Sequence, residues 1–594
     1  MSQIYVIDLG GQYAHLIGNR VRRLGVYAEV RSNDCKASDL QDAQGIILSG
    51  GPKGVKEEGA PEIDHEIFQL GKPVLGICYG HQMMAHYLGG EIGTEREYGF
   101  TDFNISKKDS QLFQGLDAKQ VVWNNHGDAV VKLPIGFEKT GSTETCEFES
   151  MENVEQKLYG VQFHPEVSHS EHGMKLLENF VLGICKCEKD WSIANFRERI
   201  EQEIKDYVGA QKVFLLVSGG VDSTVCFALL NQVLGPERVY GLHVDSGFMR
   251  QDESEKVKQM FAEIGYDNLH IYDAKNNFLK AVGSATEPEE KRRAIGEEFI
   301  RVAALATSDL ELDPAEWILA QGTIYPDTIE SGGSKHADRI KTHHNRVDGI
   351  QKLIAAGKLL EPIKDLYKDE VRELGIKLGL PEEMIYRHPF PGPGLAVRTL
   401  CAQQNEKLKI KNDPTLIDIV GPEISAQILP VKSVGVQGDA RSYAHPALLE
   451  VTEIDWDKLG KVSVKITNSI REVNRVLVKL AGDSENLELQ AATLTEDRLD
   501  LLRVADQLFH DELRKAGLYH EVWQAPVVLV PLVNEQGETI VLRPINSTEA
   551  MTANFAKLPL DFVKKVAAKI LNLKGIGLVA YDITNKPPGT IEWE

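Results

Sequence analysis

The chain has 594 residues, more than one hydrophobic core can organise, so we expect three or more domains. Its formal net charge of −22 at pH 7 argues against a general binder of nucleic acid or of anionic membranes, because such binding needs a broad basic surface. A local basic pocket for a small anion stays compatible with that charge.

No apolar run is long enough to span a bilayer, and the N-terminal MSQIYVIDLGG enters a strand pattern without a basic signal segment. We therefore expect a cytoplasmic protein that acts away from membranes. The seven cysteines are scattered without paired C-x-x-C spacing, which favours neither a disulfide framework nor a zinc site. A cysteine that carries a function is expected to do so through its reactivity.

Short apolar strands alternate with helical patterns over the first 180 residues. The strand candidates are IYVID, YAEV, GIILSG, PVLGICYG and KLYGVQFHP. This alternation is typical of a mostly parallel sheet covered by helices. It stops near residue 183, and we expect a first α/β domain over residues 1–186.

A second and a third domain are expected downstream. The segment SIANFRERIEQEIKDYVG places five apolar residues on one helical face: Ile193, Phe196, Ile200, Ile204 and Val208. This helix would open an α/β domain with a parallel, doubly wound sheet over residues 190–394, whose central strands include VFLLV and VYGLHVDSG. From residue 395 to 594, VKSVGVQGDARSY, APVVLVPLV and ETIVLRPI predict an α+β domain, enlarged by a charged, helical insertion near residues 451–505.

The first candidate site is the turn in PVLGICYGHQ. An apolar strand ends at Cys78 and a helix follows, which is the strand-to-helix elbow that exposes a nucleophile beside backbone donors. A thiol at the start of a helix ionises more readily than a free one. A lone cysteine there is also typical of a buried core thiol, so a base is needed to favour the reactive interpretation.

A candidate base lies 86 residues downstream, in VQFHPEVSHS. His164 and Glu166 follow another strand, and an imidazole paired with a carboxylate is the arrangement that orients a general base. Together, GICYGHQ and FHPEVSHS resemble the class I glutamine amidotransferases. The resemblance implies that Cys78 attacks the amide of L-glutamine, with His164 as base and Glu166 as its orienting partner.

The same resemblance extends to LSGGPKGV, residues 48–55, which is similar to the oxyanion strand of that family. It implies that the backbone N–H groups of Gly51 and Tyr79 stabilise the oxyanion. The chain reads GHQ after the elbow where many relatives read GMQ. We expect this difference to have little effect on the glutaminase site, because the residue follows the elbow.

The second candidate site is SGGVDS, a glycine turn between the strand VFLLV and an apolar helical pattern. Such a turn presents free N–H groups and a positive helix end to a phosphate, yet it lacks the lysine of GxxxxGK[ST]. It resembles the loop of the N-type ATP pyrophosphatases, which split ATP between its α and β phosphates. The resemblance implies that ATP binds to Ser218, Gly219, Gly220, Val221, Asp222, Ser223 and Thr224, with Asp222 facing Mg²⁺.

Six further segments are similar to the glutamine-hydrolysing GMP synthetases: EEKRRAIGEEFI, AQGTIYPDTIES, IKTHHN, RHPFPGPGLAVR, GVQGDAR and the C-terminal YDITNKPPGTIEWE. The resemblance covers nearly the whole chain. It implies a glutamine-dependent carbon–nitrogen ligase that aminates xanthosine 5′-monophosphate (XMP). The residues matching positions that contact XMP are Arg292, Asp439, Gln524, Lys586, Ile591 and Glu592. The family's third domain carries dimer contacts, so a homodimer is implied.

Several alternatives stay open at this stage. Lys368, in LYKDEVR, suits either a contact with pyrophosphate or a solvated helix face. Ammonia made at Cys78 must reach the ATP site by a channel or by a domain movement. A glutamine-dependent NAD synthetase also couples ammonia to such an adenylation, but with a nitrilase-like glutaminase that GICYGHQ does not resemble. A protein that kept this fold and lost catalysis would need a damaged site, and the motifs are intact.

Overall fold

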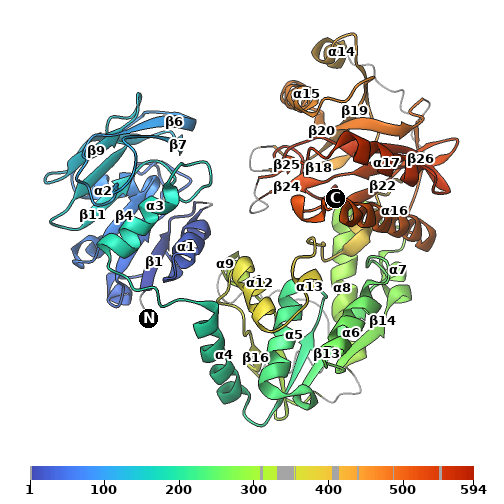
Figure 1. Ribbon diagram of the computed structural model, residues 1–594, viewed down its shortest axis with the longest axis horizontal. Coiled ribbons are helices and arrows are strands. Elements are labelled where there is room, and N and C mark those ends of the chain that lie inside the picture. The colour runs from blue at the N-terminus through green and yellow to red at the C-terminus, as the bar shows by residue number, and fades with distance from the viewer. Residues whose placement is uncertain are drawn as a thin grey trace. The chain divides into compact units, whose positions relative to one another are not determined.

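The computed structural model describes residues 3–11, 13–307, 312–330, 353–354, 356–403, 414–437, 440–485, 487–547 and 552–594. The chain forms two compact units, Met1–Ile200 and Glu201–Glu594 (Figure 1). The second unit covers most of the range of the two domains predicted after residue 190, and the predicted bounds 1–186, 190–394 and 395–594 stay predictions. None of the helices in the described ranges is long and apolar enough to cross a membrane.

The first unit is built on one large sheet. Five of its strands run parallel in the order β2 (Tyr27–Ser32), β1 (Gln3–Asp8), β3 (Gly45–Leu48), β4 (Val74–Ile77) and β11 (Leu158–Val161). All five predicted strands are confirmed. The sheet continues with antiparallel strands, β10 (Ser150–Asn153), β9 (Glu138–Ser142), β6 (Glu97–Ile105) and β7 (Lys119–His126), so it is parallel only over its first half.

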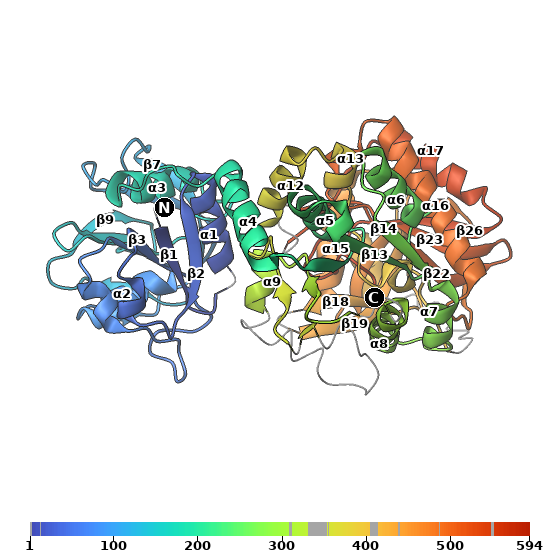
Figure 2. The ribbon, with the colours of Figure 1, turned by 90° about the horizontal axis from the view of Figure 1, so that it is seen from below.

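Helices cover both faces of the parallel half. Figure 2 shows α1 (Ala14–Arg23) and α3 (Gly173–Glu178) on one face and α2 (Tyr79–Tyr87) on the other. The strands are buried on both faces, as their continuous apolar runs require, and Ile46, Leu48 and Met83 belong to one buried cluster. A small sheet of β5 (Glu91–Gly93) and β8 (Ala129–Lys132) adjoins α2.

The helix predicted after the linker is α4 (Ile193–Val208). Its five predicted apolar residues are all buried: Ile193, Phe196, Ile200, Ile204 and Val208. The 3.6-residue period of the sequence therefore identified the buried face of this helix correctly.

The second unit contains a five-stranded parallel sheet. Its order is β14 (Leu269–Asp273), β13 (Val239–Asp245), β12 (Lys212–Leu216), β15 (Trp317–Ala320) and β16 (Leu359–Leu360). From β12 the chain first builds β13 and β14 on one side and later β15 and β16 on the other. This reversal defines a topological switch point at the end of β12, as in a doubly wound fold.

The helices of this part of the second unit alternate with those strands. They are α5 (Val221–Leu234), α6 (Glu253–Glu263), α7 (Lys275–Val282), α8 (Pro288–Ala306), α9 (Tyr325–Glu330), α12 (Lys368–Lys377) and α13 (Glu382–Ile385). Helix α5 packs against both α12 and α13.

The rest of the second unit is an α+β arrangement, as predicted. Its mixed sheet has the order β17 (Ser425–Ile428), β19 (Ala440–Glu450), β20 (Val473–Gly482), β26 (Gly575–Asp582), β23 (Gly537–Leu542), β22 (Val527–Asn534) and β21 (Glu488–Leu489), with β18 (Ser433–Gln437) paired to β19. Helices α15 (Trp456–Ser469), α16 (Glu496–Lys515) and α17 (Leu560–Leu571) pack on this sheet, and α14 (Pro414–Val420) packs on α15 and β17 (Figure 1).

The prediction that residues 451–505 are helical is wrong for Val473–Gly482. This segment forms β20, which lies between β19 and β26, and its first six residues are buried. Charged residues flank a short run of Val and Leu in the sequence, so the apolar signal of a covered central strand was diluted by its neighbours.

Candidate active sites

Cys78 lies at a strained elbow in the first unit. It stands between β4 and α2 with φ 52° and ψ −106°, a backbone conformation that is rare outside glycine. A Cβ atom at Gly76 would lie 2.6 Å from the carbonyl carbon of Gly80, and one at Gly80 would lie 2.5 Å from the carbonyl oxygen of Leu48. The two glycines therefore allow the tight turn, and strain of this kind is typical of a turn that carries a nucleophile, although the Cys78 side chain itself is buried.

His164 faces the same space as Cys78. A Cβ atom at Gly50 would lie 3.2 Å from His164 Cε1 and 3.9 Å from Cys78 Cβ. His164 Nδ1 lies 2.7 Å from Glu166 Oε1, and both side chains are buried. Burial alone would lower the pKa of His164, but the Glu166 carboxylate and the Cys78 sulfur raise it well above its usual value.

Neighbouring groups hold this histidine in place. The His164 amide donates to the carbonyl oxygen of Trp123 at 3.1 Å. The Ser170 hydroxyl donates to the His164 carbonyl oxygen at 2.6 Å and accepts from the Trp123 amide at 3.0 Å. The ring of Tyr13 meets the His164 ring edge-on, with 5.3 Å between centroids. The imidazole can therefore serve as a fixed base, as an oriented triad requires.

The sequence did not single out Gln162, whose amide nitrogen donates to Cys78 Sγ at 3.6 Å. Gln162 directly follows β11 and lies two residues before His164. This position was the only sign of its role in the sequence. Such a contact places a polar donor beside the sulfur.

The two predicted oxyanion donors lie next to each other. A Cβ atom at Gly51 would lie 2.7 Å from Tyr79 Cγ, so this position excludes a side chain. Within the described residues, the N–H groups of Gly51 and Tyr79 donate no backbone hydrogen bond outside regular elements, whereas the Gly80 amide donates to Ser49. Both N–H groups are thus available for an oxyanion.

The glycine turn of the second unit lies at the carboxyl end of β12. This is the switch point of the sheet, where open α/β sheets bind ligands. Gly219 has φ 82°, and Gly220 caps α5. The hydroxyls of Ser218 and Ser223 lie 3.1 Å apart, and the Ser223 hydroxyl lies 3.1 Å from the Gly220 carbonyl oxygen. The turn gathers hydroxyls and a helix N-terminus around one spot.

Val221, Asp222, Ser223 and Thr224 form the first turn of α5. Asp222 Oδ2 lies 2.5 Å from Nζ of Lys368, the first residue of α12. The other carboxylate oxygen of Asp222 is buried and has no hydrogen-bond partner in the described ranges. The structure therefore places Lys368 beside the turn, which itself contains no lysine.

A second cation adjoins the turn. Nη2 of Arg387 lies 3.7 Å from the position of a Cβ atom at Gly219, and it lies 2.5 Å from Glu253 Oε1. The sequence signal for Arg387 was present, because RHPFPGPGLAVR was one of the resembling segments, but nothing in that segment indicated that its first residue reaches the loop.

Two of the predicted XMP residues meet directly. Gln524 Nε2 donates to Glu592 Oε1 at 3.0 Å. The same carboxylate accepts two hydrogen bonds from the buried guanidinium of Arg398, at 2.8 and 2.9 Å. This bidentate pair fixes the C-terminal segment against the loop before residue 400.

Arg292 contacts Glu594, the last residue of the chain. It donates to the backbone carbonyl oxygen of Glu594, and its neighbour Lys291 forms a buried ion pair with the Glu594 carboxylate. Burial raises the pKa of Glu594 to about 7, although Lys291 opposes that shift. Trp593 is fully buried and donates from Nε1 to Asp582 at 3.0 Å. The C-terminal segment is therefore packed against the rest of the second unit.

The other residues predicted to contact XMP make no such direct contacts with one another in the described part of the chain. The backbone of Lys586 pairs with Ala553 through bonds of 2.7 and 3.1 Å, and burial lowers the pKa of its ammonium. Ile591 is half-buried. Asp439 lies outside the described residues, as does the segment 340–345.

Relatives of known name cover the whole chain. A probable glutamine-hydrolyzing GMP synthase of Leptospira interrogans serogroup Icterohaemorrhagiae is 46% identical over 606 aligned residues, covering 100% of this chain and 99% of that protein. The glutamine-hydrolyzing GMP synthase of Vibrio vulnificus is 39% identical over 608 aligned residues, with the same two coverages. The chain belongs to the family of glutamine-hydrolysing GMP synthases.

Family models divide this GMP synthase family chain into three matched parts. The class-I glutamine amidotransferase model matches residues 5–184, the NAD synthase model residues 192–304, and the GMP synthase C-terminal domain model residues 422–484 and 511–593. The crystal structure of a putative GMP synthase subunit from Thermoplasma acidophilum is 33% identical in sequence and matches 31% of this chain and 94% of its own, with a TM-score of 0.29. Because residues 5–184 match the class-I glutamine amidotransferase model and the full-length relatives are GMP synthases, the NAD synthetase alternative loses its support.

The departure at GHQ has a structural explanation in this member of the GMP synthase family. His81 is fully buried, and its Nε2 lies 3.1 Å from the Phe148 carbonyl oxygen. A Cβ atom at residue 160 would lie 2.4 Å from His81 Nδ1, so Gly160 makes room for the ring. Burial lowers the pKa of His81 to about 3, which keeps it neutral.

Proposed function

We propose that this chain is a glutamine-hydrolysing GMP synthase whose two units each carry one catalytic site. ATP adenylates XMP at the C2 oxygen, and ammonia released from glutamine displaces AMP to give GMP. The products are GMP, AMP, pyrophosphate and glutamate. The strained Cys78 elbow facing the His164–Glu166 pair, on the same chain as a lysine-free glycine turn, carries this proposal.

The first site would hydrolyse glutamine. The Cys78 sulfur attacks the amide carbon, and the N–H groups of Gly51 and Tyr79 bind the resulting oxyanion. His164 takes the proton of the Cys78 thiol and passes it to the leaving nitrogen, so ammonia departs and a thioester remains. Glu166 stabilises the imidazolium between these steps, and water then releases glutamate. The 2.7 Å contact between Nδ1 and the carboxylate supports this role.

The second site would hold the phosphates of ATP. Backbone N–H groups of the loop and the hydroxyls of Ser218, Ser223 and Thr224 suit the pyrophosphate that departs, and Lys368 supplies a positive charge beside it. The partnerless oxygen of Asp222 fits a Mg²⁺ ligand, because hard carboxylate oxygen is the donor this ion prefers. Bound Mg²⁺ would neutralise phosphate charge during transfer.

XMP would bind along the docked tail. Arg292 and Lys586 suit the nucleotide phosphate, while Gln524 and Glu592 offer hydrogen bonds to the base or ribose. Ile591 would contribute an apolar contact, and Asp439 is proposed on the sequence resemblance alone. The mutual contact of Gln524 and Glu592 supports a shared subsite.

The decisive experiment compares two nitrogen sources. Purified wild type and Cys78→Ala are supplied with ATP, Mg²⁺ and XMP, and then with either glutamine or ammonium. We expect the variant to lose GMP formation from glutamine and to keep it from ammonium, with one AMP formed per GMP. Equal loss with both sources would contradict two separate sites, and ADP in place of AMP would refute the assignment of the loop.

We also propose that the enzyme works in the cytoplasm, independently of membranes and nucleic acid, as a homodimer through the part following residue 395. The support is the family resemblance of that part. Light scattering coupled to size-exclusion chromatography measures the mass directly, and a mass equal to one chain at assay concentration would contradict the dimer.

A further inference from the structure

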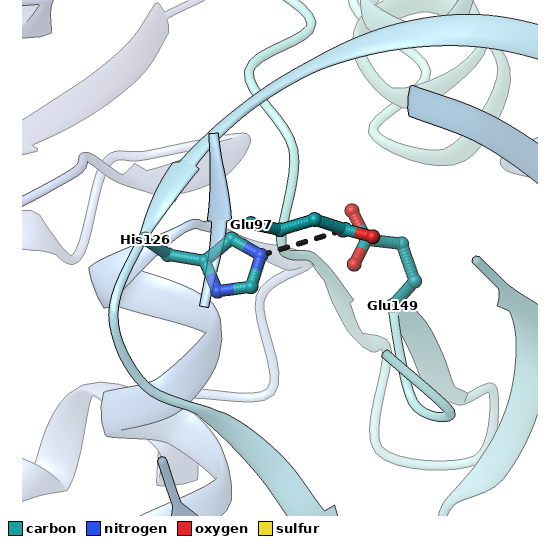
Figure 3. A group of neighbouring side chains, drawn as sticks. All are labelled: Glu97, His126 and Glu149. Carbon is teal, nitrogen blue, oxygen red and sulfur yellow. Dashed lines mark ion pairs between the residues drawn. The ribbon is translucent and has the colours of Figure 1, made fainter. Parts of the chain in front are cut away.

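A second cluster of polar side chains lies in the first unit, close to the cysteine site. Glu97 begins β6 and His126 ends β7, and the two residues are direct partners in the register of this hairpin. Glu149 stands immediately before β10 and points at both of them (Figure 3). One ligand atom from each residue lies within 4.8 Å of the others, and all three residues are buried.

The three side chains turn acceptor atoms toward one another. His126 Nδ1 lies 3.0 Å from the carbonyl oxygen of Asp128, which only accepts, so Nδ1 carries a hydrogen and, in the neutral ring, Nε2 presents its lone pair. That Nε2 lies 3.7 Å from Glu97 Oε2 and has no hydrogen-bond partner in the described part of the chain. Lone pairs that face each other in a buried space are stabilised by a proton or a metal cation between them.

Glu149 independently indicates that this cluster suits a cation. Its exposed fraction is 0%, and neither carboxylate oxygen has a hydrogen-bond partner among the described residues. A buried ionised carboxylate in this state is strongly unfavourable, so a native protein pairs it, binds a cation to it or keeps it protonated.

Glu97 is held as an ionised and oriented ligand would be. Its carboxylate accepts from Asn124 Nδ2 at 2.8 Å, from the Thr143 hydroxyl at 2.8 Å, and from the Thr145 hydroxyl. Together with the Nδ1 contact of His126, these bonds form a set of supporting contacts of the kind that orients metal ligands.

We propose that Glu97, His126 and Glu149 bind one divalent transition-metal ion of the zinc class. One imidazole nitrogen and two carboxylate oxygens are a borderline donor set, which suits Zn²⁺, Co²⁺ or Mn²⁺ better than Ca²⁺ or Mg²⁺. Three protein ligands leave a fourth position for water. The sequence gives no local sign of this site, because its three ligands come from separate segments of the chain.

The ion would brace the segments that support His164. Trp123, whose carbonyl oxygen accepts from the His164 amide, lies on β7 three residues before His126. The Glu149 carbonyl oxygen accepts from the amide of Gln162 at 2.8 Å. The metal would thus tie the end of the β6–β7 hairpin to the segment that precedes β10, as a structural crosslink and not as part of the reaction.

Metal binding to the full-length protein tests this inference. The chain is stripped with a chelator, dialysed and titrated with Zn²⁺, and bound metal is counted by mass spectrometry. We expect one zinc ion per chain in wild type, in Glu147→Gln, which changes an exposed carboxylate two residues from Glu149, and in Cys78→Ala, which removes the elbow thiol. Glu149→Gln and His126→Gln should bind at least about 10-fold more weakly.

Three outcomes would overturn the inference: no zinc retained by wild type, equal affinity in Glu149→Gln, or loss of binding in Cys78→Ala. Near-UV circular dichroism checks that each variant is folded. If both ligand variants unfold, the absorption spectrum of Co²⁺-loaded wild type decides. Bands of a nitrogen- and oxygen-bound ion support the site, and a sulfur-to-metal charge-transfer band places the ion at a cysteine and refutes it. A binding readout is independent of the proposed synthase activity.

Discussion

Glu166→Gln tests the glutaminase geometry most sharply. The substitution keeps the shape of the side chain and removes the charge that lies 2.7 Å from His164 Nδ1 in a buried site. A hydrogen bond to a charged group contributes about 1.5–3 kcal/mol. At about 1.36 kcal/mol per tenfold, we expect glutamine-driven GMP formation to fall about 10- to 150-fold. Ammonium-driven formation should not change, because the second unit is untouched.

The pH dependence of stability offers a second readout of the same variant. Burial lowers the pKa of His164 and the Glu166 charge raises it, with the increase prevailing in the wild type. A histidine with a raised pKa adds stability that is fully present below its unfolded value of 6.5 and is lost as the pH rises through its folded value. The wild type should therefore exceed Glu166→Gln in unfolding free energy most below pH 6.5.

Glu178→Gln is the matched control, because Glu178 forms only a partly exposed pair with Lys175 on α3. Such pairs contribute about 0–1 kcal/mol, so this control should keep both activities. A Glu166→Gln enzyme whose glutamine-driven rate stays within about 3-fold of wild type would refute the assigned role, since that factor is below the expected range. Equal losses with glutamine and ammonium would point to general misfolding instead.

Three further substitutions test other parts of the structure. The wild type should lose unfolding free energy as the pH falls below 6.5, because the buried His81 has a pKa of about 3 and resists protonation in the folded state. His81→Met should not show this loss, which is about 1.4 kcal/mol at pH 5.5. Chemical denaturation at several pH values measures the difference. Lys368→Met should slow GMP formation from both nitrogen sources, whereas the exposed Lys364→Met should not; steady-state kinetics with either source decides. Gly50→Ala should cut glutaminase activity about 10-fold or more, measured as glutamate release, because the new methyl would lie 3.2 Å from His164 Cε1.

The sequence predicted those features that are contiguous along the chain. A local period or a short motif predicted the five strands around the elbow, the buried face of α4 and both glycine turns. The contacts between residues of distant segments could not be predicted from the sequence. Lys368 reaches Asp222 across 146 positions, and Arg398 reaches Glu592 across 194. No local pattern indicates such a pairing, since the fold alone brings the segments together.

The net charge illustrates the same limit from another side. A charge of −22 excludes a broad basic surface, yet buried cations adjoin the residues proposed for XMP. Lys291 and Arg398 are fully buried, and the carboxylates of Glu594 and Glu592 pair with them. Buried cations require such partners, because an unpaired one costs several kcal/mol (on the order of 3–5). An acidic chain can therefore hold buried cations beside the residues proposed for an anionic nucleotide, and the carboxylates that pair with these cations add to the negative net charge.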